Sequence, residues 1–262
     1  MFRANNIRKV QNYLNRDPLK HIIHLKTLMT YPHDIETFYI AHGEVEGVLL
    51  LLPTVISPYD LQTYPGSQYL ALPAANDLAV SRQILDHVPS HVPVVFKFID
   101  SLVQAAAMER FKLERVGAFH SYTSSPGATY QAGDDVVVSP RLDARLLPLY
   151  SYNGYDPIFV QSHFAARRAF SCTIYDLAEP VSTCLVYQNY DNIWEIGAVY
   201  TQPGYRARGL ATQVVVAALD QLLVDNCIPR YQIFEQNIAS QGLAEAIGLR
   251  RFLTVTHFLH QP

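Results

Sequence analysis

The sequence is poor in the features that mark secreted, metal-binding or nucleic-acid-binding proteins. Its three cysteines, Cys172, Cys184 and Cys227, form no C-x-x-C pair, so they indicate neither a disulfide framework nor a zinc knuckle. Lysine and arginine total 20 against 23 aspartate and glutamate, a formal net charge of -3. Binding to nucleic acid regardless of base sequence needs a basic surface. We therefore expect a reduced, intracellular setting and no nucleic-acid partner.

Long hydrophobic runs are also missing. The longest apolar stretch, GVLLLLPTVI at 47–56, is well short of the roughly 18–20 residues that a membrane span needs. The first residues, MFRANNIRKVQNYL, lack the apolar core of a signal peptide. These absences predict a cytoplasmic protein without a membrane partner, in which the apolar stretch forms a buried strand.

Metal ligands are equally scarce. His21 and His24 are three residues apart in a segment with helical spacing, but the sequence offers no third ligand nearby. Cys172 and Cys184 fall in predicted strands, where a free cysteine packs as a small apolar residue. The sequence predicts no metal site.

Helix and strand patterns alternate along the chain in two similar halves. SSPGATYQAGDD, at 124–135, is rich in turn-forming residues and is the best candidate linker. We expect an N-terminal domain at 1–125, a linker at 126–136 and a C-terminal domain at 137–262. Both halves end in strand, helix and strand, and this order, more than the few identities, favours a duplicated fold. An offset of 136 residues gives the identical pairs Phe98 and Phe234, Glu109 and Glu245, Leu113 and Leu249, and Arg115 and Arg251.

The segment YTQPGYRARGLATQVVVAALDQLL, at 200–223, runs from a predicted strand through a glycine-bearing loop into an apolar helix. The first turn of a helix has unpaired N–H groups and a dipole that favours negative charge, so a phosphate fits there. Gly209 lets the backbone approach such a ligand, and Arg206 and Arg208 add positive charge. Neither G-x-x-x-x-G-K-[ST] nor G-x-G-x-x-G occurs. The segment therefore predicts an anion-binding loop of another kind.

The loop R-x-x-G-x-A at 206–211 resembles the coenzyme A loop of the GCN5-related N-acetyltransferases (GNAT), whose signature is Arg/Gln-x-x-Gly-x-Gly/Ala. Its surroundings resemble that family too. EIGAVYTQPGYRARGLA, at 195–211, is similar to the fourth strand and loop of the fold. NIASQGLAEAIGL, at 237–249, is similar to the segment N-x-x-[AS]-x-x-L-x-x-x-[IL]-G-[FL] that follows the fifth strand. The resemblance covers roughly residues 137–258.

The resemblance implies a fold and an activity. The fold would be α/β (α+β), a mixed and mostly antiparallel sheet flanked by helices, with a second, degenerate GNAT-like half at the N-terminus. The activity would be transfer of an acyl group from acetyl-CoA to an amine of a small molecule or peptide, by direct attack in a ternary complex. A coenzyme A-binding sensor without turnover is the alternative. Transfer of an aminoacyl group from tRNA is disfavoured by the negative charge. We expect a monomer or homodimer.

The resemblance also assigns residues to the coenzyme. Backbone N–H groups of the loop would hold the pyrophosphate, and the preceding strand would pair with the pantetheine arm, with one N–H polarising the thioester carbonyl. Two residues at the next helix would line the far side of the cleft. The residues are Val199, Tyr200, Thr201, Arg206, Ala207, Arg208, Gly209, Leu210, Ala211, Thr212, Asn237 and Ser240. Two have simpler interpretations as well, since Asn237 is a favourable helix N-cap and Arg208 suits a solvated side chain.

Glu195 and Tyr200 are the expected catalytic residues. An amine attacks only when neutral, so some group must accept a proton. Glu195 precedes Arg206 by eleven residues, where histone-type members of the family carry a carboxylate base, although a strand glutamate is also an ordinary surface residue. Many relatives have a tyrosine, thought to protonate the leaving thiolate, where this sequence has Ala244. The sequence therefore leaves the general acid without a candidate.

The first half offers no second loop of this type. At the same offset the loop falls within YLALPAAND, at 69–77, which has neither arginine nor glycine. We expect the first half to form a wall of the acceptor cleft and to supply a sheet edge to the second half. The tyrosine-rich segment PLYSYNGYDP, at 148–157, is either part of an acceptor pocket or ordinary packing.

Overall fold

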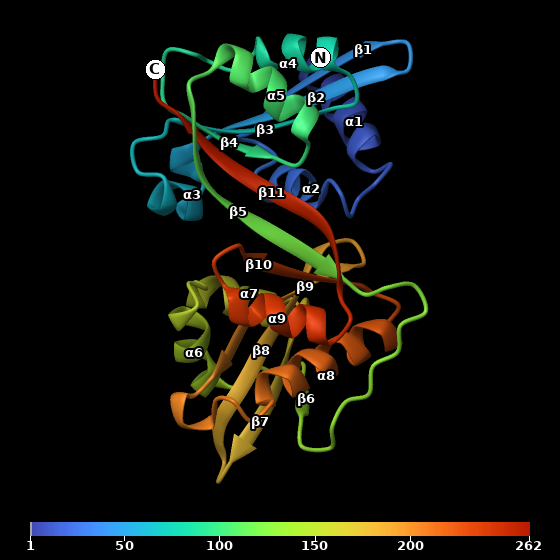
Figure 1. Ribbon diagram of the computed structural model, residues 1–262, viewed down its shortest axis with the longest axis vertical. Coiled ribbons are helices and arrows are strands. Elements are labelled where there is room, and N and C mark those ends of the chain that lie inside the picture. The colour runs from blue at the N-terminus through green and yellow to red at the C-terminus, as the bar shows by residue number, and fades with distance from the viewer. Residues whose placement is uncertain (1) are drawn as a thin grey trace. The chain divides into compact units, whose positions relative to one another are not determined.

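The computed structural model describes residues 2–262, and the chain divides into two compact units. Unit 1 combines the residues up to Phe119 with Leu253–Pro262, and unit 2 is His120–Phe252. Figure 1 shows the elements of each unit along the chain. The C-terminal segment belongs to unit 1 because its strand pairs there, whereas the division expected from the sequence assigns it to the second domain. The expected domain boundaries stay a prediction.

The sheet of unit 1 has the strand order β1-β2-β3-β4-β11-β5, and β5 and β11 cross the boundary between the units. The strands are β1 (Glu36–His42), β2 (Val45–Pro53), β3 (Tyr69–Ala75), β4 (Val94–Phe98), β5 (Leu113–Thr123) and β11 (Arg250–His260). The helices are α1 (Phe2–Leu14), α2 (Ile22–Thr30), α3 (Pro58–Thr63), α4 (Leu78–Leu85) and α5 (Ser101–Arg110), with a 3-10 turn η1 (Thr54–Ile56).

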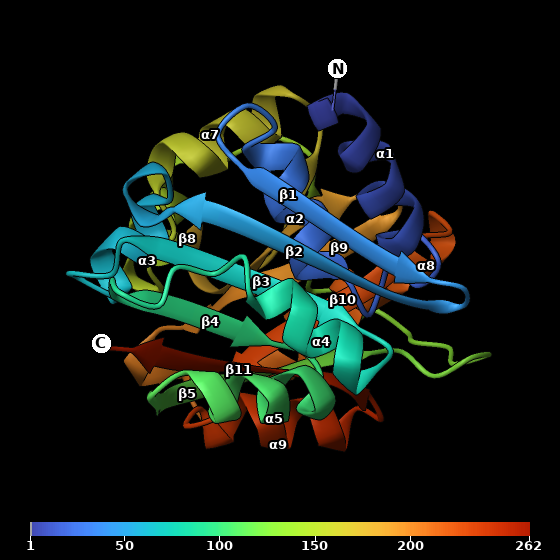
Figure 2. The ribbon, with the colours of Figure 1, turned by 90° about the horizontal axis from the view of Figure 1, so that it is seen from above.

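The core of unit 1 forms around β2. Its residues 48–52 are at most 5% exposed, so the apolar stretch is a strand buried on both faces, as predicted. Helices α4 and α5 begin at Asp77 and Asp100, whose carboxylates accept backbone N–H hydrogen bonds as N-caps. Figure 2 shows both helices over one face of this sheet, with β11 beside β4.

The sheet of unit 2 has the strand order β5-β10-β9-β8-β7-β6. Its further strands are β6 (Val137–Ser139), β7 (Ala169–Asp176), β8 (Glu179–Tyr190), β9 (Ile193–Thr201) and β10 (Ile228–Phe234). The helices are α6 (Leu147–Tyr152), α7 (Pro157–Ala165), α8 (Leu210–Val224) and α9 (Ile238–Ala246), with 3-10 turns η2 (Ala144–Leu146) and η3 (Pro203–Tyr205).

Unit 2 buries both faces of its sheet. Side chains alternate between the faces along a strand, and neighbours in β8 accordingly enter different cores. Cys184 packs in the cluster that contains the apolar side chains of α8, and Leu185 packs in the cluster built on α6 and α7. Both cysteines expected to be core residues, Cys172 and Cys184, are fully buried and free.

The last strand of each half completes the sheet of the other unit. The end of β5 belongs to unit 2, where the Thr123 hydroxyl donates to the carbonyl of Pro229 in β10 at 2.7 Å. In unit 1, β11 pairs with β4 antiparallel and sets His257 opposite Lys97. The end of β5 thus lies beside β10 in unit 2.

The elements expected from the sequence are present, with local differences. The 3-10 turn η2 directly precedes α6, which has Pro148 in its first turn. The sequence did not predict helices α1, α3 and α7 or strand β6. In the described residues, no helix has the length and hydrophobicity to cross a bilayer. Within the same residues, no cluster of three or more metal-ligating side chains occurs.

Candidate functional site

Strand β9 carries a bulge in the middle of the predicted coenzyme segment. In its antiparallel pairing with β8, Leu185 lies opposite Gly197 and Thr183 opposite Tyr200. Two residues of β9, Ala198 and Val199, therefore face the single intervening residue of β8, as in a β-bulge. Ala198 has φ 47°, in the left-handed region, which marks the same irregularity. The bulge changes the direction of the amides that follow it.

The two central strands of unit 2 stop pairing just beyond this point. Strands β9 and β10 pair in parallel over 193–196 and 228–231, and then both continue, to Thr201 and Phe234. The ladder between them thus ends where the bulge begins. Beyond the end of a ladder, the backbone N–H and C=O groups of the two strands no longer pair with each other. Because buried backbone groups require hydrogen-bond partners, these groups can pair with another extended chain. This is the place at which the sequence predicts the pantetheine arm.

The loop between β9 and α8 presents unpaired amides, and we call residues 206–212 the amide loop. Gly209 is the N-cap of α8, with φ 76°, and has no side chain with which to cap the helix. The first backbone bond of α8 runs from Gln213 N to Gly209 O at 3.1 Å. In the part of the chain that the structure describes, the N–H groups of residues 207–212 have no hydrogen-bond acceptor. They form the positive end of a 15-residue helix.

The side chains of the two arginines in the amide loop form hydrogen bonds with nearby backbone carbonyls. Arg206 donates from Nε to the carbonyl of Thr201 at 3.1 Å. Arg208 donates from Nη2 to the carbonyl of Gly204 at 2.9 Å, and its guanidinium lies 5.1 Å from the centre of the Tyr205 ring. Both side chains are exposed, so they retain N–H groups that face solvent. The arginines hold the loop in shape and leave its charge positive.

Unit 1 repeats this arrangement without the open amides. Strands β3 and β4 pair in parallel only over 69–71 and 94–96, and β3 continues to Ala75. Helix α4 follows at once, and the carboxylate of Asp77 accepts the N–H of Val80 at 3.0 Å. A carboxylate already occupies the helix N-terminus where an anion would bind. This agrees with the expectation that the first half has no coenzyme loop.

Glu195 lies in a buried polar network in β8, β9 and β10. Its carboxylate accepts hydrogen bonds from the Tyr187 hydroxyl at 2.7 Å and from Asn189 Nδ2 at 2.6 Å. It also forms an ion pair with Arg230, which is only 2% exposed. Arg230 in turn donates from Nη2 to the hydroxyl of Ser121 at 3.2 Å. We call these five residues the Glu195 network.

The Glu195 network is closed to direct contact with an acceptor. Glu195 is 5% exposed, and its carboxylate is enclosed by Tyr187, Asn189 and Arg230. Burial, and then the Glu195 charge, raise the pKa of Tyr187 well above its ordinary value, so this phenol keeps its proton. The sequence did not point to Tyr187 or Arg230. An arginine within an apolar strand, IPRYQIF, was the available signal, because a buried arginine requires an acidic partner.

The other predicted residues lie around the end of β9. Tyr200 is half-buried, and its ring meets that of the exposed Tyr152 edge-on at 5.4 Å. Thr201 Oγ1 lies 2.9 Å from the Ser182 hydroxyl, and Val199 packs against the core beneath α8. Tyr200 and Thr201 share one strand end with the amide loop, whereas Glu195 lies before the bulge.

Asn237 and Ser240 lie at the start of α9, after β10. The side chain of Asn237 accepts the N–H of Ser240 at 3.1 Å, so the simpler interpretation as an N-cap holds. Burial raises the pKa of Tyr231 to about 12, although the Ser240 side chain acts in the opposite direction. Ala244 is completely buried in the core. Its side chain faces the core of unit 2 and can supply no general acid.

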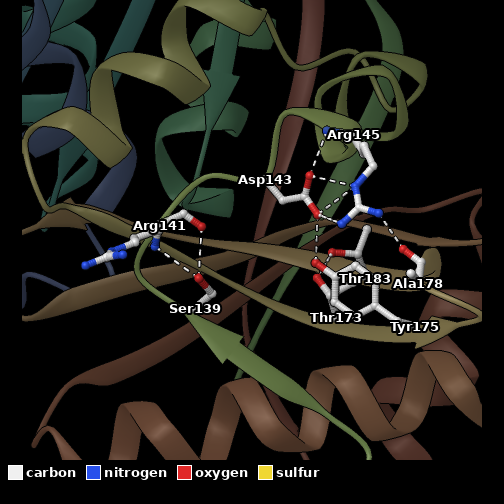
Figure 3. A network of polar contacts seen from close by, with 8 residues as sticks. All are labelled: Ser139, Arg141, Asp143, Arg145, Thr173, Tyr175, Ala178 and Thr183. Carbon is white, nitrogen blue, oxygen red and sulfur yellow. Dashed lines mark hydrogen bonds and ion pairs between the residues drawn. The ribbon is translucent and has the colours of Figure 1, made fainter.

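Figure 3 shows a second polar network, which includes Thr183, the neighbour of Tyr200 across the β8–β9 pairing. Asp143 accepts from the backbone N–H and the guanidinium of Arg145, and from the hydroxyl of Tyr175 at 3.0 Å. These contacts, the Arg145 side chain first, lower the pKa of Asp143 to about 2. Arg145 also donates to the carbonyl of Ala178 in the β7–β8 turn. The network fastens the segment before α6 to the hairpin of β7 and β8.

Comparisons with known proteins relate this chain to one family of enzymes. Residues 142–249 match the model of the acetyltransferase (GNAT) family. A GCN5-related N-acetyltransferase from Kribbella flavida superposes with a TM-score of 0.56 at 13% identity, over 92% of this chain and 95% of that one. An acetyltransferase from the GNAT family from Colwellia psychrerythraea gives 0.56 at 10% identity, over 94% and 90%.

A third solved structure bears on the two halves. A tandem GNAT protein from the clavulanic acid biosynthesis pathway superposes with a TM-score of 0.55 at 12% identity, over 92% of this chain and 88% of that one. At such identities the likeness concerns the fold. It confirms the predicted fold class, a mixed sheet with helices in two GNAT-like halves. A search of curated proteins gave no match.

Proposed function

Because residues 142–249 belong to the acetyltransferase (GNAT) family, we propose that this chain is an acyl-CoA-dependent N-acyltransferase. It takes the acyl group from acetyl-CoA and passes it to an amine of a small molecule or peptide. The observation that carries the proposal is the run of unpaired N–H groups at residues 207–212. Successive free amides at a helix N-terminus bind the oxygens of a phosphate or pyrophosphate.

The coenzyme would extend from the amide loop towards the bulge. The N–H groups of the loop, from Arg206 to Thr212, would hold the pyrophosphate. The backbone of Val199 to Thr201 would pair with the pantetheine arm where β10 no longer does. Asn237 and Ser240 would line the opposite side, at the start of α9. The support for this placement is that the free amides and the end of the β9–β10 ladder belong to one continuous segment.

The reaction would be a direct transfer. The amine nitrogen attacks the thioester carbonyl, a C–N bond forms, and the C–S bond breaks with its electron pair on sulfur. The nitrogen gives up one proton, and the thiolate takes one up. A thiol has a pKa of about 8.5, so the thiolate leaves readily without a dedicated acid. A backbone N–H just after the bulge would stabilise the negative charge that develops on the carbonyl oxygen.

For the proton that the amine loses, we propose Glu195 and Tyr200. Tyr200 is half-buried at the strand end next to the amide loop. Glu195 is buried among donors, so a proton would reach its carboxylate through the Tyr187 hydroxyl that donates to it at 2.7 Å. A bound water near the amine would serve the same purpose at pH values where the amine is partly neutral.

A second candidate function is coenzyme A binding without turnover, as in a sensor. Two observations favour it. The Glu195 carboxylate is already occupied by Tyr187, Asn189 and Arg230. The position at which many GNAT enzymes have their tyrosine is Ala244, within the core. Both candidates require the same coenzyme site, and they differ only in chemistry.

Thermal unfolding with and without acetyl-CoA tests the shared site. At a hundred times its Kd the ligand stabilises the fold by about 2.7 kcal/mol. The Arg206→Glu variant should lose this shift. Arg82→Glu, at an exposed arginine paired with Glu109 in unit 1, changes the net charge equally and should keep it. Absence of a shift in the natural protein would contradict both functions.

Release of coenzyme A in the presence of an amine panel separates the two candidates. Amine-dependent release that Arg206→Glu abolishes supports the transferase. Tight binding without release, over polyamines, amino acids, arylamines and peptide N-termini, supports the sensor instead.

A further inference from the structure

The loop between α6 and α7 places the Tyr155 hydroxyl against the backbone of β9, just before the bulge. A Cβ atom built on Gly197 would overlap this hydroxyl and lie 2.9 Å from Cζ of the same ring. Position 197 therefore accepts only glycine while Tyr155 keeps its place. The Tyr155 ring also meets the Tyr187 ring edge-on at 6.0 Å, which brings it to the margin of the Glu195 network.

Tyr155 contacts both the backbone of β9 and Tyr187. Glu195 is an acceptor, so Tyr187 donates its only proton to it. Tyr155 contacts Tyr187 and forms a hydrogen bond with the backbone of Ala198. Tyr155 thus lies between the bulge and the residue that donates to Glu195. Burial, and then the Glu195 charge, raise the pKa of Tyr155, which keeps this phenol protonated.

Tyr187 donates to the Glu195 carboxylate, and the position of this carboxylate is fixed by its other partners. Glu195 is held by Arg230 and Asn189 from its other side, and Arg230 is held by Ser121 on β5. The Glu195 carboxylate is fixed by these partners, although Nε of Arg230 and Oδ1 of Asn189 have no hydrogen-bond partner among the described residues. The Glu195 network is thus a fixed anchor in the sheet, and Tyr155 connects that anchor to the bulge.

We propose that Tyr155 is a positioning residue for acyl transfer, which fixes the bulge at Ala198 and thereby the direction of the following amides, Val199 to Thr201. The inference rests on the proposed function, which assigns those amides to the thioester and the pantetheine arm. With the amide of Ala198 taken by Tyr155, the next amides of β9 are the ones that remain for the coenzyme. Glu195 then acts through Tyr187 and Tyr155 as well as by its charge.

The test compares Tyr155→Phe with Tyr175→Phe. Both variants remove a phenol hydroxyl from unit 2 that bonds within a carboxylate network, which for Tyr175 is the one at Asp143. Tyr155→Phe should lower kcat for amine acetylation about 10- to 100-fold, the effect of misplacing reacting groups by a fraction of an ångström to one ångström. The Kd for acetyl-CoA should change less than about threefold, because the amide loop is intact. Tyr175→Phe should leave kcat unchanged.

Gly197→Ala gives a second, independent perturbation. Its Cβ displaces the Tyr155 hydroxyl without removing it, so kcat should fall as in Tyr155→Phe. The double variant should be little worse than either single one, since both break the same contact. Additive losses would overturn the proposal. So would a kcat for Tyr155→Phe equal to that of the natural protein.

Hydrogen exchange gives a readout that needs no turnover. The Ala198 amide should exchange faster in Tyr155→Phe than in the natural protein, and at the natural rate in Tyr175→Phe. Unchanged protection of Ala198 would overturn the proposal even for a protein that proves to be a sensor. If the proposed function is wrong, the natural protein will neither bind acetyl-CoA nor release coenzyme A, and this result differs from those above. A loss of kcat with a shifted pH profile would assign Tyr155 to proton transfer and not to positioning.

Discussion

The carboxylate of Asp77 accepts the N–H of Val80 at 3.0 Å and closes the N-terminus of α4. In unit 2 the corresponding helix, α8, begins at Gly209 with no side-chain cap. Both helices follow a strand that pairs in parallel with its neighbour over only a few residues. The two units therefore differ at the point where an anion would bind, since an acidic side chain caps the helix in unit 1 and no side chain does so in unit 2.

Gly209→Asp should give α8 an acidic N-cap, like the one that Asp77 provides for α4. The new carboxylate would repel a pyrophosphate and compete for the free amides, so the Kd for acetyl-CoA should rise at least tenfold. Gly209→Ala is the matched control, because both variants place a side chain at φ 76°, which glycine tolerates best. Isothermal titration calorimetry of the two variants isolates the effect of the charge. Equal affinities for Asp and Ala would contradict a phosphate site at this helix.

The fold and the amide loop were predictable because their signals are local. Strand alternation, helix periodicity and the glycine before α8 each depend on residues that are neighbours in the chain. The spacing of Arg206, Gly209 and Ala211 identified the loop, and its backbone is open in the structure. The coenzyme contacts themselves stay a prediction.

The Glu195 network was not predictable, because it depends on register. Tyr187 meets Glu195 as its cross-strand neighbour, and Arg230 is its parallel neighbour on β10. A shift of one residue in either pairing would turn these side chains to the opposite face. The role of Glu195 was predicted from its spacing to Arg206, and that spacing does not determine which residues lie opposite Glu195 on the neighbouring strands.

Arg230→Met should destabilise unit 2 strongly. It removes one partner of a buried ion pair and leaves the Glu195 charge without it, which costs about 3–5 kcal/mol in the free energy of unfolding. Adding Glu195→Gln should recover part of this loss, because the remaining charge is then removed. Urea denaturation of both variants measures the coupling. Arg82→Met, at a pair more than half exposed on both sides, should lower the free energy of unfolding much less. An Arg230→Met loss no larger than that of Arg82→Met would show that the buried pair contributes little.

Asp143→Asn should lower stability at neutral pH and not in strong acid. The pKa of Asp143 is lowered to about 2 in the fold, chiefly by the Arg145 side chain, from an ordinary value near 3.8. Its contribution is therefore complete above about pH 4 and disappears as the pH falls through 2. We expect a difference of about 1 kcal/mol at pH 7, after allowance for solvent screening of the partly exposed arginine. Chemical denaturation from pH 7 to pH 2 measures it, and a difference that persists at pH 2 would contradict the ion pair as its source.

His257 should make unit 1 sensitive to mild acid. Burial, and then the charge of Lys97, lower the pKa of His257 to about 2, and its Nδ1 is hydrogen-bonded to the Tyr64 hydroxyl. The folded chain keeps this histidine neutral, while the unfolded chain takes up a proton below about pH 6.5. Stability is therefore present above pH 6.5 and is lost as the pH falls below it, by about 1.4 kcal/mol per pH unit from this residue.

The variant His257→Gln separates this titration from the general effect of acid. Glutamine retains a hydrogen-bonding group for Tyr64 but takes up no proton. It should be less stable than the natural protein at pH 7, since its shape fits the site less well. Lys97 is paired with Asp60 and is present in both proteins, so it affects both alike. The difference in the free energy of unfolding between the natural protein and His257→Gln should shrink by about 2–3 kcal/mol between pH 6.5 and pH 4.5. Only the natural protein has a side chain at position 257 that takes up a proton when the chain unfolds. Urea titrations at the two pH values decide it, and parallel pH dependences would mean that His257 does not titrate in the unfolded chain as assumed.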